Sequence, residues 1–206
     1  MKSYFDSLTA EESALFSKLK TPQITQDFLE TIPQNFEREG RTILSPRRLI
    51  REWKAHCFEG AIFAAATVWF NGGKPLLLDL KTTEGDDDHV VALYERNKKW
   101  GAMSKTNHAV LRYRDAVYES PRELAMSYFH EYFLNSSGVK TLKSYAIFDL
   151  SDIHKNWIID EQNLLYVDKA IEKAKHTLII KDAERKYLRN ADPVERKIGS
   201  FVVWKE

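Results

Sequence analysis

The chain has 206 residues, of which 43% are hydrophobic, and its 31 basic and 30 acidic residues leave a formal net charge of +1. This length supports one well-packed core. The balanced charge gives no electrostatic reason to expect a nucleic-acid or anionic-membrane partner. A single cysteine excludes an intramolecular disulfide. Because no segment has the apolar length of a signal peptide or a membrane span, we expect a soluble cytoplasmic protein.

Capping signals predict helices in the first quarter of the chain. Thr9 and Glu12 form a capping-box pattern before an apolar run, and a second short helix is expected over residues 22–31. Ser45 supplies an N-cap and Pro46 a first-turn proline for a third helix. The N-terminal part of the chain is therefore expected to be helical.

The segment from Lys54 to Phe70 is predicted to be an apolar helix that stops at Asn71-Gly-Gly73. The only cysteine, Cys57, lies at the N-terminal end of this helix. At a helix N-terminus, free backbone N–H groups and the helix dipole favour the thiolate, which is the nucleophilic form of cysteine. A histidine alongside would complete the activation. The alternative is that Cys57 is a small buried core residue, which is the commoner role of an isolated cysteine.

Strands cluster in the middle of the chain. Apolar runs separated by short polar turns predict strands over residues 75–80, 89–94, 99–104, 109–113 and 144–150. Connections of hairpin length favour antiparallel pairing, because parallel pairs need long crossovers. We therefore predict an α+β fold in which a helical layer containing the Cys57 helix packs on an antiparallel sheet.

Helices are expected again after the fourth of these strands. Ser120, Pro121 and Glu123 form a capping pattern for one helix, and a charged helix is predicted over about residues 161–175. Residues 200–204 are expected to form an edge strand or an ordered tail.

Four segments between about Ser45 and Asn107 carry a family resemblance. They are His-Cys57-Phe-Glu-Gly-Ala, Asn-Gly-Gly-Lys-Pro75-Leu-Leu-Leu-Asp-Leu, Asp-His89-Val-Val-Ala-Leu-Tyr and Lys-Trp100-Gly-Ala-Met-Ser104. In order and spacing this region resembles the core of the transglutaminase-like superfamily, which is related to the papain-type cysteine proteases. The resemblance implies a nucleophilic cysteine on a helix, a histidine base on the following strand, and a third residue that orients the histidine.

The third position departs from the family pattern. Where the family usually has an aspartate, the register from His89 and Trp100 places Ser104. A serine hydroxyl can fix the tautomer of the imidazole but carries no charge to stabilise the imidazolium. Asn107 is the second candidate for the orienting role, as an asparagine has it in papain-like enzymes. The acidic run Asp86–Asp88 could also approach the histidine, although such a run is more often a solvated loop.

Other polar residues have a structural explanation. His56 is expected to flank the cleft, because adjacent helical residues point about 100° apart, and His108 is expected on a surface loop. The pair His130-Glu131 lacks the second histidine of a zinc-protease helix, and Asp86–Asp88 lacks the spacing of an EF-hand loop. No nucleotide-binding motif occurs. We therefore expect no metal ion or other cofactor.

Two functions follow from these observations. The first is a cysteine hydrolase or acyltransferase that acts on an amide or related acyl bond of a peptide, a protein or a small molecule, with Cys57 as nucleophile and His89 as base. The second is a transglutaminase-like fold that serves binding or scaffolding after loss of the chemistry. In both cases residues 45–150 form the transglutaminase-like core, while residues 1–44 and 151–206 form helical extensions of the same domain.

Overall fold

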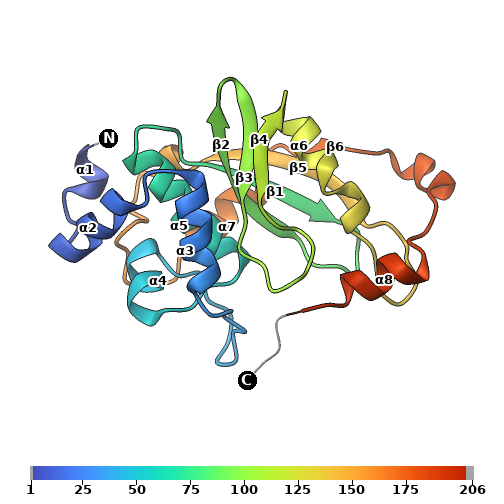
Figure 1. Cartoon of the computed structure of the whole chain (residues 1–206), viewed down its shortest axis with the longest axis horizontal. Coiled ribbons are helices and arrows are strands. Elements are labelled where there is room, and N and C mark those ends of the chain that lie inside the picture. The colour runs from blue at the N-terminus through green and yellow to red at the C-terminus, as the bar shows by residue number, and fades with distance from the viewer. Residues whose placement is uncertain (1, 203–206) are drawn as a thin grey trace.

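The structure, a computed structural model, describes residues 2–202 and shows an α+β protein (Figure 1). Within these residues, eight α-helices pack against a six-stranded antiparallel open sheet of order β4-β3-β2-β1-β5-β6. The helices are α1 (Lys2–Phe5), α2 (Ala10–Lys18), α3 (Pro22–Thr31), α4 (Pro46–Glu52), α5 (Cys57–Phe70), α6 (Pro121–Ser127), α7 (Leu165–Glu172) and α8 (Pro193–Gly199). The strands are β1 (Leu76–Thr82), β2 (His89–Arg96), β3 (Lys99–Met103), β4 (Arg114–Tyr118), β5 (Leu142–Asp149) and β6 (Thr177–Leu178).

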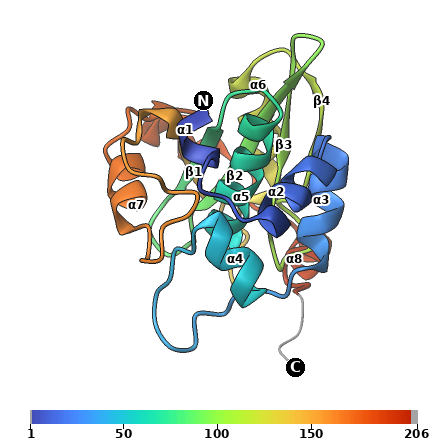
Figure 2. The same ribbon diagram turned by 90° about the vertical axis from the view of Figure 1, so that its left-hand side faces the viewer.

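The sheet is covered on both faces, and alternate residues of its central strands serve the two layers. On β1, Leu77 belongs to the apolar cluster around α5, whereas Leu78 and Leu80 belong to a second cluster that includes Leu124 and Tyr128 of the α6 region. Seen from the side, α1 to α5 gather on one face of the sheet (Figure 2). Helix α5 is the centre of this layer.

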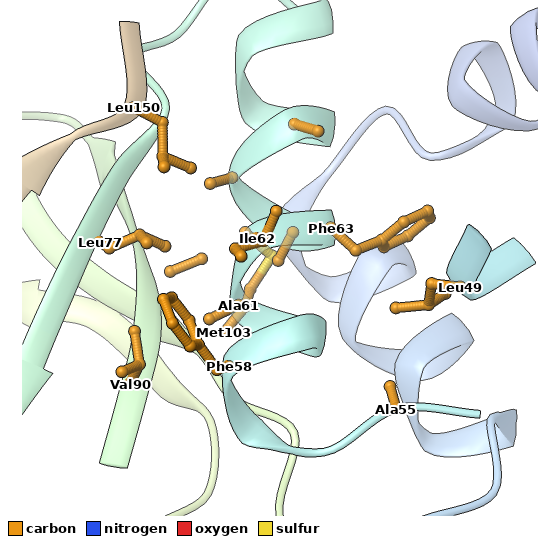
Figure 3. Packing of buried hydrophobic residues seen from close by; sticks show 14 of the residues in the cluster. Leu49, Ala55, Phe58, Ala61, Ile62, Phe63, Leu77, Val90, Met103 and Leu150 are labelled. Atoms are coloured by element: carbon orange, nitrogen blue, oxygen red, sulfur yellow. The ribbon is translucent and has the colours of Figure 1, made fainter. Parts of the chain in front are cut away.

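Helix α5 is buried nearly all round because most of its side chains are apolar. On one side Ala61 and Ile62 face Leu77 of β1 and Val90 of β2 (Figure 3). On the other side Phe63 packs toward the N-terminal helices. A helix that is apolar all round has to lie in the core, and this one connects the sheet to the N-terminal helical layer.

The predicted fold class and most of the predicted elements are confirmed. The helix over residues 22–31 agrees with α3, and Thr9, Ser45 and Ser120 each accept a hydrogen bond from the third residue of the helix they cap. Four of the five predicted strands overlap β1, β2, β3 and β5. These signals are local in sequence, which explains why they could be read without tertiary information.

The strand predicted over residues 109–113 is wrong, since β4 begins only at Arg114. Leu111 has a φ angle of +61°, a left-handed conformation that a strand cannot contain. Its backbone N–H is bound by the Glu131 carboxylate and its carbonyl by the Ser104 hydroxyl. Long-range side-chain contacts therefore hold this segment as a loop in spite of its apolar residues.

The C-terminal part of the chain also differs from the prediction in detail. Helix α7 spans only residues 165–172, and β6 adds a short edge strand to the sheet beside β5, so the part after residue 150 is not wholly helical. Of the predicted element over residues 200–204, Val202 makes an isolated antiparallel bridge with His108, and the remainder beyond it lies outside the described residues. From Lys2 to Val202, no helix is long and apolar enough to cross a membrane.

Candidate functional site

Cys57 is the first residue of α5 because the residues around it form a helix cap. Trp53 adopts a left-handed conformation (φ +51°) that ends α4, and the chain turns before α5 begins. His56 is the N-cap residue: its Nδ1 accepts the Phe58 N–H at 3.2 Å, and its own backbone N–H donates to the Glu59 carboxylate at 2.9 Å. Cys57 is half-buried on the wall of a cavity of about 580 Å³, at the positive end of the helix dipole.

His89 is the first residue of β2 and lies on the same cavity wall, buried to about 95%. Its Nε2 is 2.9 Å from the Ser104 Oγ, just after β3. Ser104 donates its single hydroxyl hydrogen to the Leu111 carbonyl at 2.6 Å, so toward His89 it has to accept. In the neutral imidazole the proton is therefore assigned to Nε2, which leaves Nδ1 as the basic nitrogen.

The Cys57 thiol is held in an environment that favours the thiolate. Burial raises the pKa of Cys57, but hydrogen bonds with His56 and His89 and the positive charges of the two rings outweigh this effect and lower the pKa to about 5. His89 lies on the same cavity wall and contributes to lowering the pKa of this thiol. Cys57 is a free cysteine, and with a pKa of about 5 its thiol is ionised at neutral pH.

His56 takes a larger part in the site than its position beside Cys57 suggested. Burial lowers its pKa, but the hydrogen bond with Cys57, the charges of Glu59 and the thiolate, and the Thr42 carbonyl raise it to about 9. The capping bond to Phe58 describes the neutral ring, in which Nδ1 is an acceptor. When the ring is protonated, Nδ1 becomes a donor and no longer accepts the Phe58 N–H.

Glu59 is a fully buried carboxylate below this histidine, and its oxygens are saturated with hydrogen bonds. Oε1 accepts from the Thr42 hydroxyl at 2.8 Å and the Leu44 N–H at 3.0 Å, Oε2 accepts from the His56 N–H, and the Asn35 amide contacts both oxygens. The His56 Nε2 is 3.5 Å from Oε1. Such a set of donors stabilises a buried negative charge. Sequence reasoning missed Glu59, although its position three residues after the cap is a capping-box signal.

Gln26 of α3 was also missed and fixes the backbone of Ser104. Its amide oxygen accepts the Ser104 N–H at 2.9 Å, and its amide nitrogen donates to the Ser104 carbonyl at 2.8 Å. One side chain thus satisfies both backbone groups of the residue that orients His89. The N-terminal extension therefore supports the site directly.

We expect Gln26→Leu to misplace Ser104 and weaken the orientation of His89. Two buried backbone groups would lose their partners, at about 1–3 kcal/mol each, and the rate at which a neutral haloacetamide alkylates Cys57 at pH 6 should fall several-fold. Urea unfolding and alkylation kinetics measure the two effects. Gln23→Leu, on the exposed side of the same helix, is the matched control and should change neither. An unchanged alkylation rate in Gln26→Leu would contradict the positioning role.

The structure brings Cys57, His89 and Ser104 together, but it does not place Asn107 on the imidazole. Asn107 lines the cavity, and no hydrogen bond joins it to His89 within residues 2–202. The acidic run Asp86–Asp88 also lies on the cavity wall, where Asp88 pairs with Lys81 at 2.8 Å. His108 lies in a cavity-lining loop. Ser104 is therefore the residue in contact with the ring.

The described residues contain no group of three or more His, Cys, Asp or Glu side chains placed to hold a metal ion. The sequence matches no protein-family model, and no curated protein is similar enough to count as a match. Any functional assignment therefore has to be argued from the geometry of the site.

Proposed function

We propose that this protein is a cysteine hydrolase or acyltransferase that acts on an amide or related acyl bond. The observation that carries the proposal is the half-buried Cys57 thiol at a helix N-terminus, on the same cavity wall as the His89 imidazole that Ser104 orients. The pKa of this thiol is lowered, and His89 is one of the causes. A lowered thiol pKa together with a positioned base is the arrangement that nucleophilic catalysis by cysteine requires. A structural core cysteine needs neither feature.

In the proposed reaction the Cys57 thiol gives its proton to Nδ1 of His89, the thiolate attacks the carbonyl carbon, and a bond forms between Sγ and that carbon. The bond to the leaving nitrogen, oxygen or sulfur then breaks, and the leaving group takes a proton from His89. Water or an amine next attacks the thioester, gives its proton to His89, and releases the acyl product with return of the thiolate. The Cys57 N–H has no partner within residues 2–202, which leaves it free to stabilise the oxyanion.

The same geometry supports a transglutaminase-like relationship for residues 45–150. A cysteine at the start of α5, a histidine at the start of β2 and an orienting residue after β3 occur here in the order that the family uses. Ser104 in place of an aspartate is the departure. We infer a member of that superfamily with an uncharged third residue, and a free thiol of this kind is compatible with a reducing compartment such as the cytoplasm.

A binding or scaffolding domain without chemistry is the second candidate. It is favoured by the absence of a carboxylate at Ser104, because a hydroxyl cannot stabilise the imidazolium by charge. It predicts that Cys57 reacts like an ordinary thiol and that no acyl-enzyme forms. The lowered pKa of Cys57 favours the enzyme over this second candidate.

The pH dependence of Cys57 alkylation tests the proposal. With a pKa of about 5 instead of the ordinary 9.0, the rate constant for iodoacetamide should rise with a midpoint near pH 5 and stay nearly level to pH 8. At pH 6 the thiolate fraction is about 10³-fold larger than for an ordinary thiol. Because nucleophilicity falls with pKa, the net gain is about tenfold. Mass spectrometry gives the rate directly, since the chain has one cysteine.

Glutathione is the control for this profile, because its thiol has no helix or histidine beside it. A midpoint for Cys57 between pH 8 and 9, parallel to that of the control, would favour the binding domain. Accumulation of an acyl-enzyme with activated esters is the second readout, because it requires the nucleophile as well as its ionisation.

A further inference from the structure

The wall of the Cys57 cavity is strongly acidic, although the whole chain is almost neutral. Eight carboxylate side chains line the cavity, against three lysine or arginine side chains and His56, whose pKa is raised to about 9. The formal charge of the whole chain is only +1. Carboxylates thus outnumber the cationic side chains on the wall of the proposed active site.

The three lysine and arginine side chains of the wall are each already engaged. Arg41 pairs with Asp168 at 2.8 Å, and Lys81 pairs with Asp88 at 2.8 Å. The Lys105 Nζ donates to the Ile32 carbonyl at 2.5 Å, and burial lowers the pKa of this lysine. Within residues 2–202, no arginine or lysine of the wall is left free to bind an anionic ligand.

Several of the carboxylates, in contrast, have no cation. Asp87 and Glu172 are exposed on the cavity wall from opposite parts of the chain, and among the described residues neither forms an ion pair. The Asp86 carboxylate accepts hydrogen bonds from the Thr141 hydroxyl and the Asp87 N–H. It too forms no ion pair among the described residues. These three carboxylates are therefore available to pair with a positively charged ligand.

Tyr132 gives a second and independent indication of a ligand. Its side chain lines the same cavity and is 98% buried, and its hydroxyl has no hydrogen-bond partner in the part of the chain that the structure describes. Burial raises its pKa, and so do the charges of Cys57, Asp86 and Asp88, which line the same cavity. Buried hydroxyls nearly always have a partner, so one without a partner beside a cavity marks the place where a polar group of a ligand can bind.

We propose that the cavity is built for an acyl substrate that carries a positive charge, an ammonium or a guanidinium group, close to the bond presented to Cys57. This inference rests on the proposed function. The acidic side chains Asp87 and Glu172 supply the long-range attraction, and the Tyr132 hydroxyl supplies a specific hydrogen bond. A narrow cleft lined by one sign of charge concentrates ligands of the other sign and raises their association rate.

Charged thiol reagents test the inference without knowledge of the substrate. Three methanethiosulfonates share one reactive group and differ in charge: 2-aminoethyl (+1), ethyl (neutral) and 2-sulfonatoethyl (−1). In each case the thiolate attacks the reagent's divalent sulfur, a disulfide bond forms, and methanesulfinate leaves. Rates at Cys57 are divided by rates with 2-mercaptoethanol, which removes the intrinsic differences among the reagents.

At low salt the normalised rate should be about tenfold higher for the cationic than for the anionic reagent, the lower end of what charged clefts give. The preference should fall toward unity at 0.5 M NaCl, because salt screens exposed charges. In the double variant Asp87→Asn/Glu172→Gln, the ratio of the cationic to the anionic rate should fall at least threefold. Asp27→Asn/Asp152→Asn removes two exposed charges that do not line the cavity, and should retain it.

A wild-type preference of one or less would overturn the charge inference, whatever the variants do. A preference that the control pair abolishes as completely as the cavity pair would also overturn it, since the effect would then belong to the net charge. The proposed function has a separate readout in the same data. Slow reaction of Cys57 with the neutral reagent, following the pH profile of an ordinary thiol, would exclude an activated nucleophile but leave the charge ratio measurable.

Discussion

Cys57→Ala is expected to abolish turnover of any acyl substrate, and His89→Ala to reduce it by about 10²–10⁴-fold, the usual contribution of general acid–base catalysis. The first change removes the nucleophile, and the second removes both the base and one of the charges that lower the thiol pKa. Because the two groups act as a unit, the double variant should lose little more than Cys57→Ala alone. Turnover of activated esters, with circular dichroism as a check on folding, measures these losses.

Ser104→Ala should reduce turnover less than either Cys57→Ala or His89→Ala. Ser104 contacts the Nε2 of His89 but not the reacting atoms, and its loss frees the ring without removing the base. Ser104→Asp should not raise activity, because a carboxylate cannot donate to the Leu111 carbonyl as the hydroxyl does. Increased activity in Ser104→Asp would instead implicate a charged third residue. Full activity in Cys57→Ala would end the nucleophile assignment.

The parts of this site that could be predicted from sequence depend on short-range signals. The start of α5 near Cys57 and the strand that begins at His89 follow from turn residues and apolar patterns. Ser104 was identified from its place in the transglutaminase-like pattern, which is counted from His89 and Trp100. Each of these signals extends over a few residues only. Prediction of the fold class succeeded for the same reason.

The supporting residues could not be predicted, because their partners are distant in sequence. Gln26 binds Ser104 across 78 residues, and Tyr132 lies 75 residues beyond Cys57 on a different element. The strand predicted just before Arg114 was wrong for the same reason, since Glu131 and Ser104 hold the backbone of Leu111. A sequence pattern gives the residue types but not which distant segment satisfies a buried polar group.

The buried carboxylate of Glu59 joins stability and reactivity, and Glu59→Gln is expected to damage both. An amide would turn one set of lone pairs into donors facing the N–H and O–H groups that now bind the carboxylate. Loss of a buried charge with its partners left in place costs about 3–5 kcal/mol. For a domain of this size that lowers the midpoint of thermal unfolding by about 10 °C.

The same substitution should shift the pH profile of Cys57. Glu59 raises the pKa of His56, and protonated His56 in turn lowers the pKa of the thiol, so without the carboxylate the alkylation midpoint should move above pH 5. Glu195→Gln is the matched control, because Glu195 closes an equivalent capping box on α8, where it is 38% exposed. It should lose less stability and leave the alkylation profile in place. A Glu59→Gln protein with the wild-type midpoint of alkylation would show that His56 and Glu59 cap the helix without tuning the thiol.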